Sequence, residues 1–568
     1  MLKALRFFPI ACCLLLLLAG CSKTNKSLRY ISKDASGIIS INTGQLLQKA
    51  GLSMLSGSPM FKEIFSNASG DSTSFNIEEM GVELFTGVVY AYAQPDQRLS
   101  SKSRFMVVVP LKDADKFGAF IKKQFKEAKI ETKDKLSLAT LDKDLCVGWD
   151  KNTAIIAATT PAPAWSDNGQ LASDANNAVI LTEEIQKTFA MPEEQSIASN
   201  KKFTDLVKAS NDISFWLNYE SLMNSLPQDQ LGTAGAVMGS QKKLLKDAFI
   251  AGGVNFEKGK ITGDATYYFN PSVKAVAEAL EAKSTNDDLL KKVQGNQLNL
   301  MMSYHINPMG VKTMLDTMGV LPLAGLGLKE YGLTLDDVLN AFSGDFLLAI
   351  TDFSVTTESQ SYTLAGSSVN YAKPVSSYKA VFSFKLKDKT AFDKLLQVAI
   401  SNQMLASTAP NTYSAGFVHL VTNGDYVAVS TEPAVAGAYL QSPGNTAFKV
   451  PAEVKNSPYG FFLDIRNSIQ TAPLDLLYGK QDTALFKEGK NLLDAVSAHG
   501  GKVKGDHTDF HFEATFVNKD ENSLLQIMRF YKKVREAESQ DSDDIDDVVP
   551  GDDTTGTAVD TAAAAEAI

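Results

Sequence analysis

The sequence predicts an α+β protein made of two tandem related halves, each a mixed or mainly antiparallel sheet with helices packed on one face. Three observations support this prediction. The chain has 568 residues, and a single hydrophobic core stops growing near ~250–300 residues, so at least two units are expected. Strand-like segments alternate polar and apolar residues, as antiparallel strands with one solvated side do. Similar segments also recur in one order at a spacing of roughly 250 residues.

The alternation is clearest in two segments. In residues 378–385, aromatic and apolar side chains at even numbers alternate with mostly polar ones at odd numbers. In residues 260–269, Ile261, Ala265 and Tyr267 share one side, while Lys260 and Asp264 share the other. Strands with one wet side favour an antiparallel or mixed sheet over a doubly wound parallel one.

Five pairs of segments carry the internal repeat. Val107–Asp113 and Phe382–Asp388 each read as an apolar strand with a Leu-Lys-Asp ending, followed by an amphipathic helix. The other pairs are 75–87 with 333–344, 154–161 with 426–433, 215–218 with 461–464, and 252–270 with 500–518. Because the order is shared, we interpret the pairs as a tandem duplication, with halves at 27–290 and 291–537. The alternative is one large α+β domain whose strand–helix units resemble each other.

The N-terminus reads as a targeting signal over residues 1–20. Lys3 and Arg6 precede an apolar run, Phe7–Leu18, that is too short to span a membrane and fits a secretory signal. The run ends in Leu18-Ala19-Gly20-Cys21, which resembles the lipobox of bacterial lipoproteins. The resemblance implies cleavage between Gly20 and Cys21 and lipidation of Cys21. Two or three acyl chains make a stable anchor, so the lipid bilayer is an expected partner.

Residues 21–33 are expected to form a polar, basic leash between the anchor and the folded body. The residue after Cys21 is Ser22, not the aspartate that retains many lipoproteins in the inner membrane. Acidic residues, which accompany surface export in Bacteroidota lipoproteins, are also missing from 22–25. Both family-level patterns favour the outer membrane, with the protein facing the periplasm.

Charge separates the C-terminal segment from the rest of the chain. The net charge is -10, and residues 538–568 contain 10 acidic residues and no Lys or Arg. We expect this segment to be a disordered acidic tail, because it has little apolar surface to bury. The remainder is close to neutral, so nucleic acid is not an expected partner.

Few residues suggest chemistry. Cys146 lies in a strand-like run and reads as a buried, inert thiol. His507, Asp509 and His511 alternate along a predicted strand, so their side chains project from one face as zinc-type ligands could. The competing interpretation is a polar outer face, with Phe510, Phe512 and Ala514 on the buried side. Phosphate-binding loops and nucleophile elbows are missing from the sequence, and no cofactor is expected.

Three segments together suggest a family. Ser32–Asn42 and the Leu-Lys-Asp endings at 111–113 and 386–388, together with the lipobox and the acidic tail, resemble an uncharacterised family of Bacteroidota lipoproteins described as a domain of unknown function. The resemblance implies a location and an architecture over most of 27–537, but no activity.

These observations predict a cell-envelope lipoprotein that acts by binding, as an accessory protein without enzymatic activity. A cleft between the two halves is the expected site, since ligand pockets concentrate at domain interfaces. The ligand is expected to be an envelope protein, a lipid or a glycan. The alternative is an envelope hydrolase or metal-dependent enzyme that uses the cluster of His507, Asp509 and His511.

Overall fold

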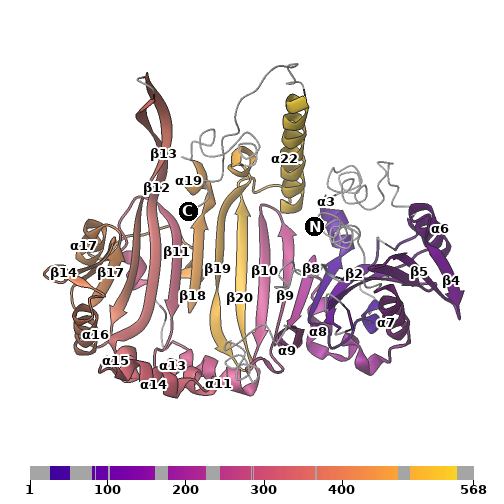
Figure 1. The fold of residues 1–568 in the computed structure, drawn as a ribbon, viewed down its shortest axis with the longest axis horizontal. Coiled ribbons are helices and arrows are strands. Elements are labelled where there is room, and N and C mark those ends of the chain that lie inside the picture. Colours follow the sequence, from indigo (N-terminus) through magenta and orange to yellow (C-terminus); the bar gives the residue numbers. More distant parts are fainter. Residues whose placement is uncertain are drawn as a thin grey trace.

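The computed structural model describes residues 26–50, 80–159, 177–225, 244–364, 367–470 and 486–546, except 84, 97, 100–102, 283, 284 and 286. Figure 1 shows a wide sheet with helices around it. The elements up to residue 280 are η2 (Lys26–Tyr30), β1 (Gly37–Asn42), α3 (Thr43–Ala50), β2 (Val88–Pro95), β3 (Ser103–Pro110), α6 (Ala114–Gln124), β4 (Lys129–Lys133), β5 (Leu136–Asp142), β6 (Leu145–Trp149), β7 (Thr153–Thr159), α7 (Ala178–Ala190), η4 (Glu193–Gln195), η5 (Ile197–Ser199), α8 (Lys201–Lys208), β8 (Ile213–Asn218), α9 (Tyr219–Ser225), β9 (Phe249–Glu257), β10 (Lys260–Tyr268) and α11 (Pro271–Leu280).

The later elements follow a similar order. They are α12 (Asp288–Lys291), β11 (Leu298–His305), α13 (Gly310–Thr317), α14 (Leu321–Lys329), α15 (Leu335–Ala341), β12 (Phe342–Leu364), β13 (Ser367–Leu386), α16 (Lys389–Ser401), β14 (Ala406–Ala409), β15 (Thr412–Ala415), β16 (Val418–Thr422), β17 (Tyr426–Ser430), α17 (Pro433–Gln441), α18 (Ala452–Lys455), β18 (Tyr459–Asp464), α19 (Ile465–Gln470), β19 (Leu493–Lys504), β20 (His507–Phe516) and α22 (Ser523–Asp546).

The strands that the structure describes form one 20-stranded sheet, and their named pairings are antiparallel. The pairings give the order β4-β5-β6-β7-β3-β2-β1-β8-β9-β10-β20-β19-β18-β11-β12-β13-β17-β16-β15-β14. Read inwards from its two ends, the sheet shows the same order twice, with strand numbers that differ by ten. The reason is that β11 to β20 pair among themselves as β1 to β10 do. The α+β prediction is confirmed. The duplication and its boundary at 290/291 stay predictions.

The pairing of β10 with β20 joins the two parts of the sheet. It runs in unbroken register from Lys260↔Thr515 to Tyr268↔His507. A side-chain contact reinforces the join, because Lys202 Nζ of α8 lies 2.9 Å from Asp506 Oδ2 and 4.0 Å from the ring centre of Tyr268. The cleft expected between the halves is therefore replaced at this join by a continuous sheet.

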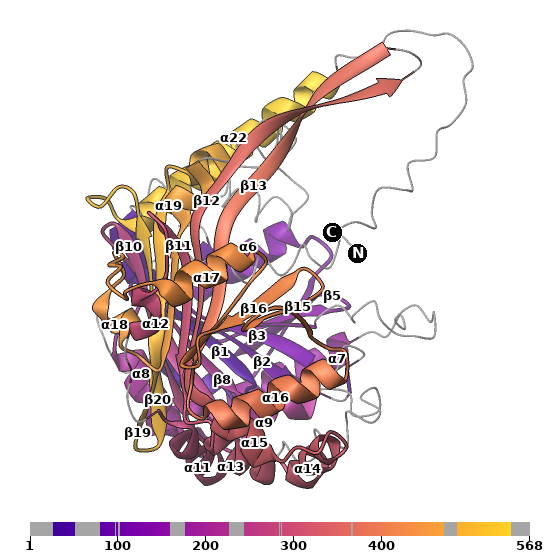
Figure 2. The same cartoon turned by 90° about the vertical axis from the view of Figure 1, so that its left-hand side faces the viewer.

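Helices cover the two sides of the sheet unequally. We call the side of the sheet that carries His511 the outer face, and the opposite side the inner face. On the outer face, α7 and α8 bury one apolar cluster, and α12, α17 and α18 bury another. On the inner face, α3, α6 and α22 cover the first part of the sheet, and α16 covers the far part. Figure 2 shows α8, α12 and α18 on one side of β20, with β5, β15 and α16 on the other.

The two Leu-Lys-Asp endings have a clear physical role. Asp113 and Asp388 are the N-cap residues of α6 and α16. The Asp113 carboxylate accepts hydrogen bonds from the backbone N–H groups of Asp115 and Lys116, and Asp388 accepts from Thr390 and Ala391. Each side chain thus satisfies two donors that have no partner within the first helical turn.

Two expected segment boundaries differ in the structure. The leash was expected to run to Lys33, but η2 already begins at Lys26, and Leu28, Tyr30 and Ile31 pack into the cluster under α7 and α8. These three side chains bury apolar surface that a solvated leash would leave in water. The tail was expected to begin at residue 538, but α22 runs to Asp546, since extending an existing helix costs less than nucleating one.

Other expectations fall outside the described residues. The signal segment, Cys21 and the last part of the tail (547–568) belong to this group. Among the residues that are described, no helix combines the length and the apolar composition that crossing a bilayer requires.

The caps lead to a prediction. Asp388→Ala is expected to destabilise the start of α16 by about 1 kcal/mol, because two backbone donors lose their acceptor. Hydrogen–deuterium exchange of residues 389–401 should become faster, whereas Gln397→Ala, an exposed change within the same helix, should leave it unaltered. Equal exchange in the two variants would contradict the capping role.

Candidate functional site

The predicted histidine cluster lies on the outer face of β20. His507, Asp509 and His511 share this face, as the alternation indicated, and face β10 across the join. Each side chain has its own nearest partner, although His507 Nε2 also lies 3.9 Å from Asp509 Oδ2. His511 Nδ1 lies 2.8 Å from Asp264 Oδ1, His507 Nδ1 lies 3.1 Å from Asp506 Oδ1, and Lys504 Nζ donates to Asp509 Oδ2 over 2.9 Å.

These partners make the cluster a row of ion pairs and hydrogen bonds across the join. Thr266 also donates a hydrogen bond to Asp509 over 2.8 Å. Hydrogen bonds from Lys202 and His507 lower the pKa of Asp506 to about 2, so this carboxylate is ionised at neutral pH. Within the described part of the chain, no group of three His, Cys, Asp or Glu side chains could hold a metal ion.

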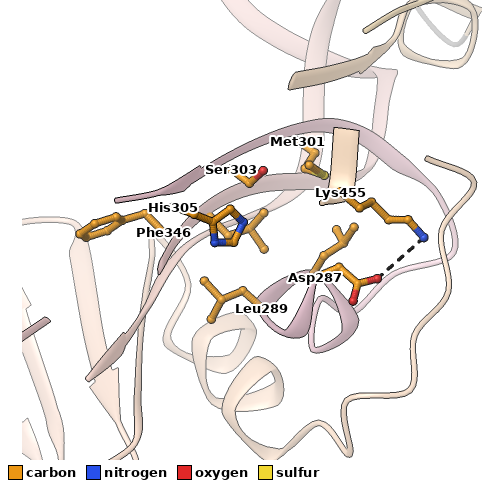
Figure 3. Close-up of a pocket in the computed structure, with 9 residues that line it drawn as sticks. Asp287, Leu289, Met301, Ser303, His305, Phe346 and Lys455 are labelled. Carbon is orange, nitrogen blue, oxygen red and sulfur yellow. Dashed lines mark ion pairs between the residues drawn. The ribbon is translucent and has the colours of Figure 1, made fainter. Parts of the chain in front are cut away.

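A second polar group lies in a cavity that the sequence did not indicate. It is lined by residues of α12, α18, β11 and β12 together with Asp287, and it is partly open to solvent. Figure 3 shows Ser303 and His305 on the strand side of this cavity, opposite Leu289, with the Asp287–Lys455 ion pair beside them. The residues come from positions up to 168 apart in the chain, so no local motif marks the cavity.

His305 forms a hydrogen bond with the carboxylate of Asp345. Its Nδ1 lies 2.8 Å from Asp345 Oδ1, and the hydrogen bond from His305 is the main cause that lowers the pKa of Asp345. An ionised carboxylate only accepts, so Nδ1 of His305 is the donor in this hydrogen bond. His305 Nε2 and Ser303 Oγ are buried without a hydrogen-bond partner among the described residues.

The two orphaned atoms do not form a catalytic pair with each other. A serine–histidine–aspartate nucleophile would need Ser303 Oγ within hydrogen-bond reach of His305 Nε2, and the two atoms are not bonded to each other.

The inner face of the six central strands is unusual because it lacks charged residues. Its side chains are those at every second position of 250–256, 261–267, 508–514, 496–500, 459–463 and 300–304. None of these positions holds a charged residue, and the polar groups are Thr508 and the tyrosine hydroxyls. On the opposite side, β10 carries Lys260 and Asp264 between threonines, and β20 carries charged or histidine side chains at 507, 509, 511 and 513.

Exposure shows that part of this apolar surface is open to solvent. Phe512 is 40% exposed and Tyr304 is 45% exposed. Ile39 on β1 and Phe382 on β13 extend the exposed surface along the sheet, at 44% and 40%. On the outer face, by contrast, Met301 of β11, which lies between Leu300 and Met302, is only 1% exposed.

The described helices reach this face only at its margins. Leu525 of α22 packs in the cluster that includes Phe256 of β9. At the other end of the strands, the ring of Tyr219 meets Tyr267 edge-on, with centroids 5.7 Å apart. The middle of the inner face, around Phe461 and Phe512, lies between these margins.

The expectation that Phe510, Phe512 and Ala514 form a buried side is therefore wrong for Phe512. Ala514 is buried, but Phe512 is among the most exposed aromatic residues described. The missed signal is the lack of charge at alternate positions of six separate strands, because alternation identifies a face without identifying what covers it.

Cys146 lies where the sequence placed it. It occupies β6 and is buried as a free cysteine. Burial raises the pKa of its thiol, which keeps it in the protonated, unreactive form at neutral pH.

The cavity leads to a pH-dependent prediction. Asp345→Asn keeps an acceptor for His305 but removes the charge, so we expect a loss of about 1 kcal/mol in the free energy of unfolding at pH 7. Since the pKa of Asp345 is lowered in the folded state, its contribution is present above the usual carboxyl pKa and is lost as the pH falls through the folded value. The difference from wild type in urea unfolding should shrink from pH 7 to pH 3.

The control for this prediction is Asp316→Asn, an exposed carboxylate of α13. This variant should match wild type at both pH values. A difference for Asp345→Asn that grows as the pH falls would contradict the assignment.

Comparisons with known proteins place the chain in a family. The model of the family described as "Domain of unknown function (DUF4836)" matches residues 29–411, which runs across the expected boundary at 290/291. The search of curated proteins found no match. Crystal form I of TP0453 shares 8% identity, covering 44% of this chain and 81% of that chain, with a TM-score of 0.23. Form IV shares 8% identity over 45% and 85%, with a TM-score of 0.24.

These TM-scores are too low for the solved structures to inform the fold or the function. The family match, in contrast, covers well over half of the sequence, from η2 into the region of β14 and β15. The protein therefore belongs to the DUF4836 family, which is defined by a domain of unknown function.

Proposed function

We propose that this protein is a cell-envelope lipoprotein that acts by binding, without catalysis, and that its inner face is the binding surface. It is anchored in the bilayer through acylated Cys21, after cleavage between Gly20 and Cys21. Its location is the outer membrane, facing the periplasm. The exposed apolar inner face of the central strands is the observation that carries the proposal.

The inner face supports binding because an uncovered apolar surface is costly. Burying apolar surface is worth ~25 cal/mol per Å², and the largest contiguous apolar patch on a typical monomer is ~300–600 Å² and often functional. Six neighbouring strands at a spacing of ~4.8 Å extend over about 24 Å. A surface of this width, with Phe512 and Tyr304 at 40% and 45% exposure, is stabilised when a ligand covers it.

The N-terminal region supports a location close to a membrane. Since η2 begins at Lys26 and is packed into the first core, only residues 22–25 separate Cys21 from the folded body. Four residues span at most about 14 Å. A lipidated Cys21 would therefore hold the body directly against the bilayer surface.

The alternative is an envelope hydrolase or metal-dependent enzyme built on His507, Asp509 and His511. In the structure these side chains are engaged in pairwise contacts with Asp506, Lys504 and Asp264. The outer face therefore offers a matched control for a test of the inner face, because His511 and Phe512 are adjacent in one strand.

Native mass spectrometry of the full lipidated chain, purified by mild extraction, tests the proposal. We expect a bound molecule as a discrete mass increment in wild type and in the double variant His507→Ala, His511→Ala. Phe512→Asp should lose most of it, since a carboxylate in the centre of the apolar face opposes its burial.

Two results would contradict the proposal. One is a mass increment that persists in Phe512→Asp. The other is loss of the increment in the histidine variant alone, with normal protein levels, which would favour the enzymatic alternative.

A further inference from the structure

We infer that the ligand of the inner face is an acyl-chain lipid, which lays its hydrocarbon on the central strands and its polar end against a row of tyrosines. This inference rests on the proposed function and deepens it, because it names the class of molecule bound. Four features of the inner face support it.

The first feature is the absence of hydrogen-bonding groups in the middle of the face. Each of the six central strands is paired on both sides, so their backbone N–H and C=O groups are used within the sheet. Among the described residues, the side chains around Phe461, Phe512 and Met302 on this face are uncharged and apolar. A peptide laid across this region would leave its own backbone groups without partners, whereas an acyl chain has none to satisfy.

The second feature is a polarity gradient along the strands. Tyr267, Tyr304 and Tyr459 lie at one end of the face, and Tyr304 and Tyr459 are paired in register with ring centroids 5.1 Å apart. Tyrosine presents an apolar ring and a polar hydroxyl, and it is enriched where hydrocarbon meets water. Burial raises the pKa of Tyr267 and Tyr459, so their hydroxyls remain neutral donors.

The third feature is the fit in size and charge. From Tyr304 to Leu300 the strand advances about 14 Å, which is close to one leaflet of a bilayer, half of a ~30 Å hydrocarbon core. The width of about 24 Å accommodates more than one chain side by side. The uncharged surface is complementary to hydrocarbon, while the charged residues of β10 and β20 lie on the outer face.

The fourth feature is the direction from which a lipid could arrive. The strand β11 leads from the tyrosine end into α13 and α14. The helix α14 buries none of its residues, and Leu323 and Leu326 are each 65% exposed. Tyr331, just after this helix, is also exposed, and α14 lies along the lowest edge of the molecule in Figure 1, where the C-terminal end of β11 with Tyr304 also lies.

A second copy of the chain fits this face poorly. The strands β5 and β15, which lie near the two ends of the sheet, and the helix α16 extend to the inner side of the sheet in Figure 2. Two inner faces brought together would meet at these projections, which hold the central strands apart. A folded partner protein remains as an outcome that the experiment can detect.

The test uses the full lipidated chain in vesicles of phosphatidylethanolamine and phosphatidylglycerol. A small fraction of the phosphatidylethanolamine carries a diazirine near the end of one acyl chain. After irradiation, peptide mass spectrometry should locate adducts in β18 and β20, at or beside Phe461 and Phe512. Phe512→Asp and Tyr304→Asp should each lower these adducts about fivefold or more, and His511→Ala should leave them unchanged.

Folding is monitored in the same sample by adducts on residues 321–331, which Phe512→Asp should not alter. Adducts confined to residues 22–33 and 321–331 in wild type would overturn the lipid assignment. If native mass spectrometry then still showed a Phe512-dependent increment with the mass of a protein or glycan, the proposed function would stand and only the ligand class would be wrong. Absence of both signals would overturn both.

Discussion

The pairing of β10 with β20 is the constraint on which the rest of the structure depends. This pair turns two separate sets of strands into one antiparallel sheet, with nine residues of each strand in register. Because side chains alternate along paired strands, one pairing assigns every neighbouring strand to a common pair of faces. The charged residues of β10 and β20 then share the outer face, and Phe510 and Phe512 of β20 share the inner face with the apolar residues of five other strands.

The helices follow from this arrangement. On each side they bury apolar clusters towards the two ends of the sheet. At the centre, α8 contributes Lys202 to the outer face, where it meets Asp506 and Tyr268. The described helices leave the centre of the inner face open, and that opening is the basis for the proposed binding role.

Much of the local structure could be predicted from the sequence. The alternation in 260–269 and 378–385 identified strands correctly, and the Leu-Lys-Asp endings marked two strand–helix junctions where the aspartates prove to be N-caps. Cys146 was correctly expected to be buried. These features depend on short-range geometry, which a sequence pattern records directly.

The remaining features depend on contacts between distant residues. Polar and basic residues suggested a leash as far as Lys33, yet Leu28 and Ile31 find a core supplied by α7 and α8. His305 and Asp345, which form a hydrogen bond, are 40 residues apart in the sequence. No sequence motif indicates that they pair. Most importantly, alternation predicted an apolar side for β20 but could not show that Phe512 would be left uncovered.

The central claim is that the inner face is open in the isolated protein and occupied in the envelope. Cysteine accessibility at position 512 tests it most directly, because Cys146 is buried and Cys21 is expected to be acylated. In Phe512→Cys, a maleimide should modify the purified, delipidated protein rapidly and the protein in intact envelopes slowly. Equally slow modification in both would contradict the account, since the face would then be covered by the chain itself.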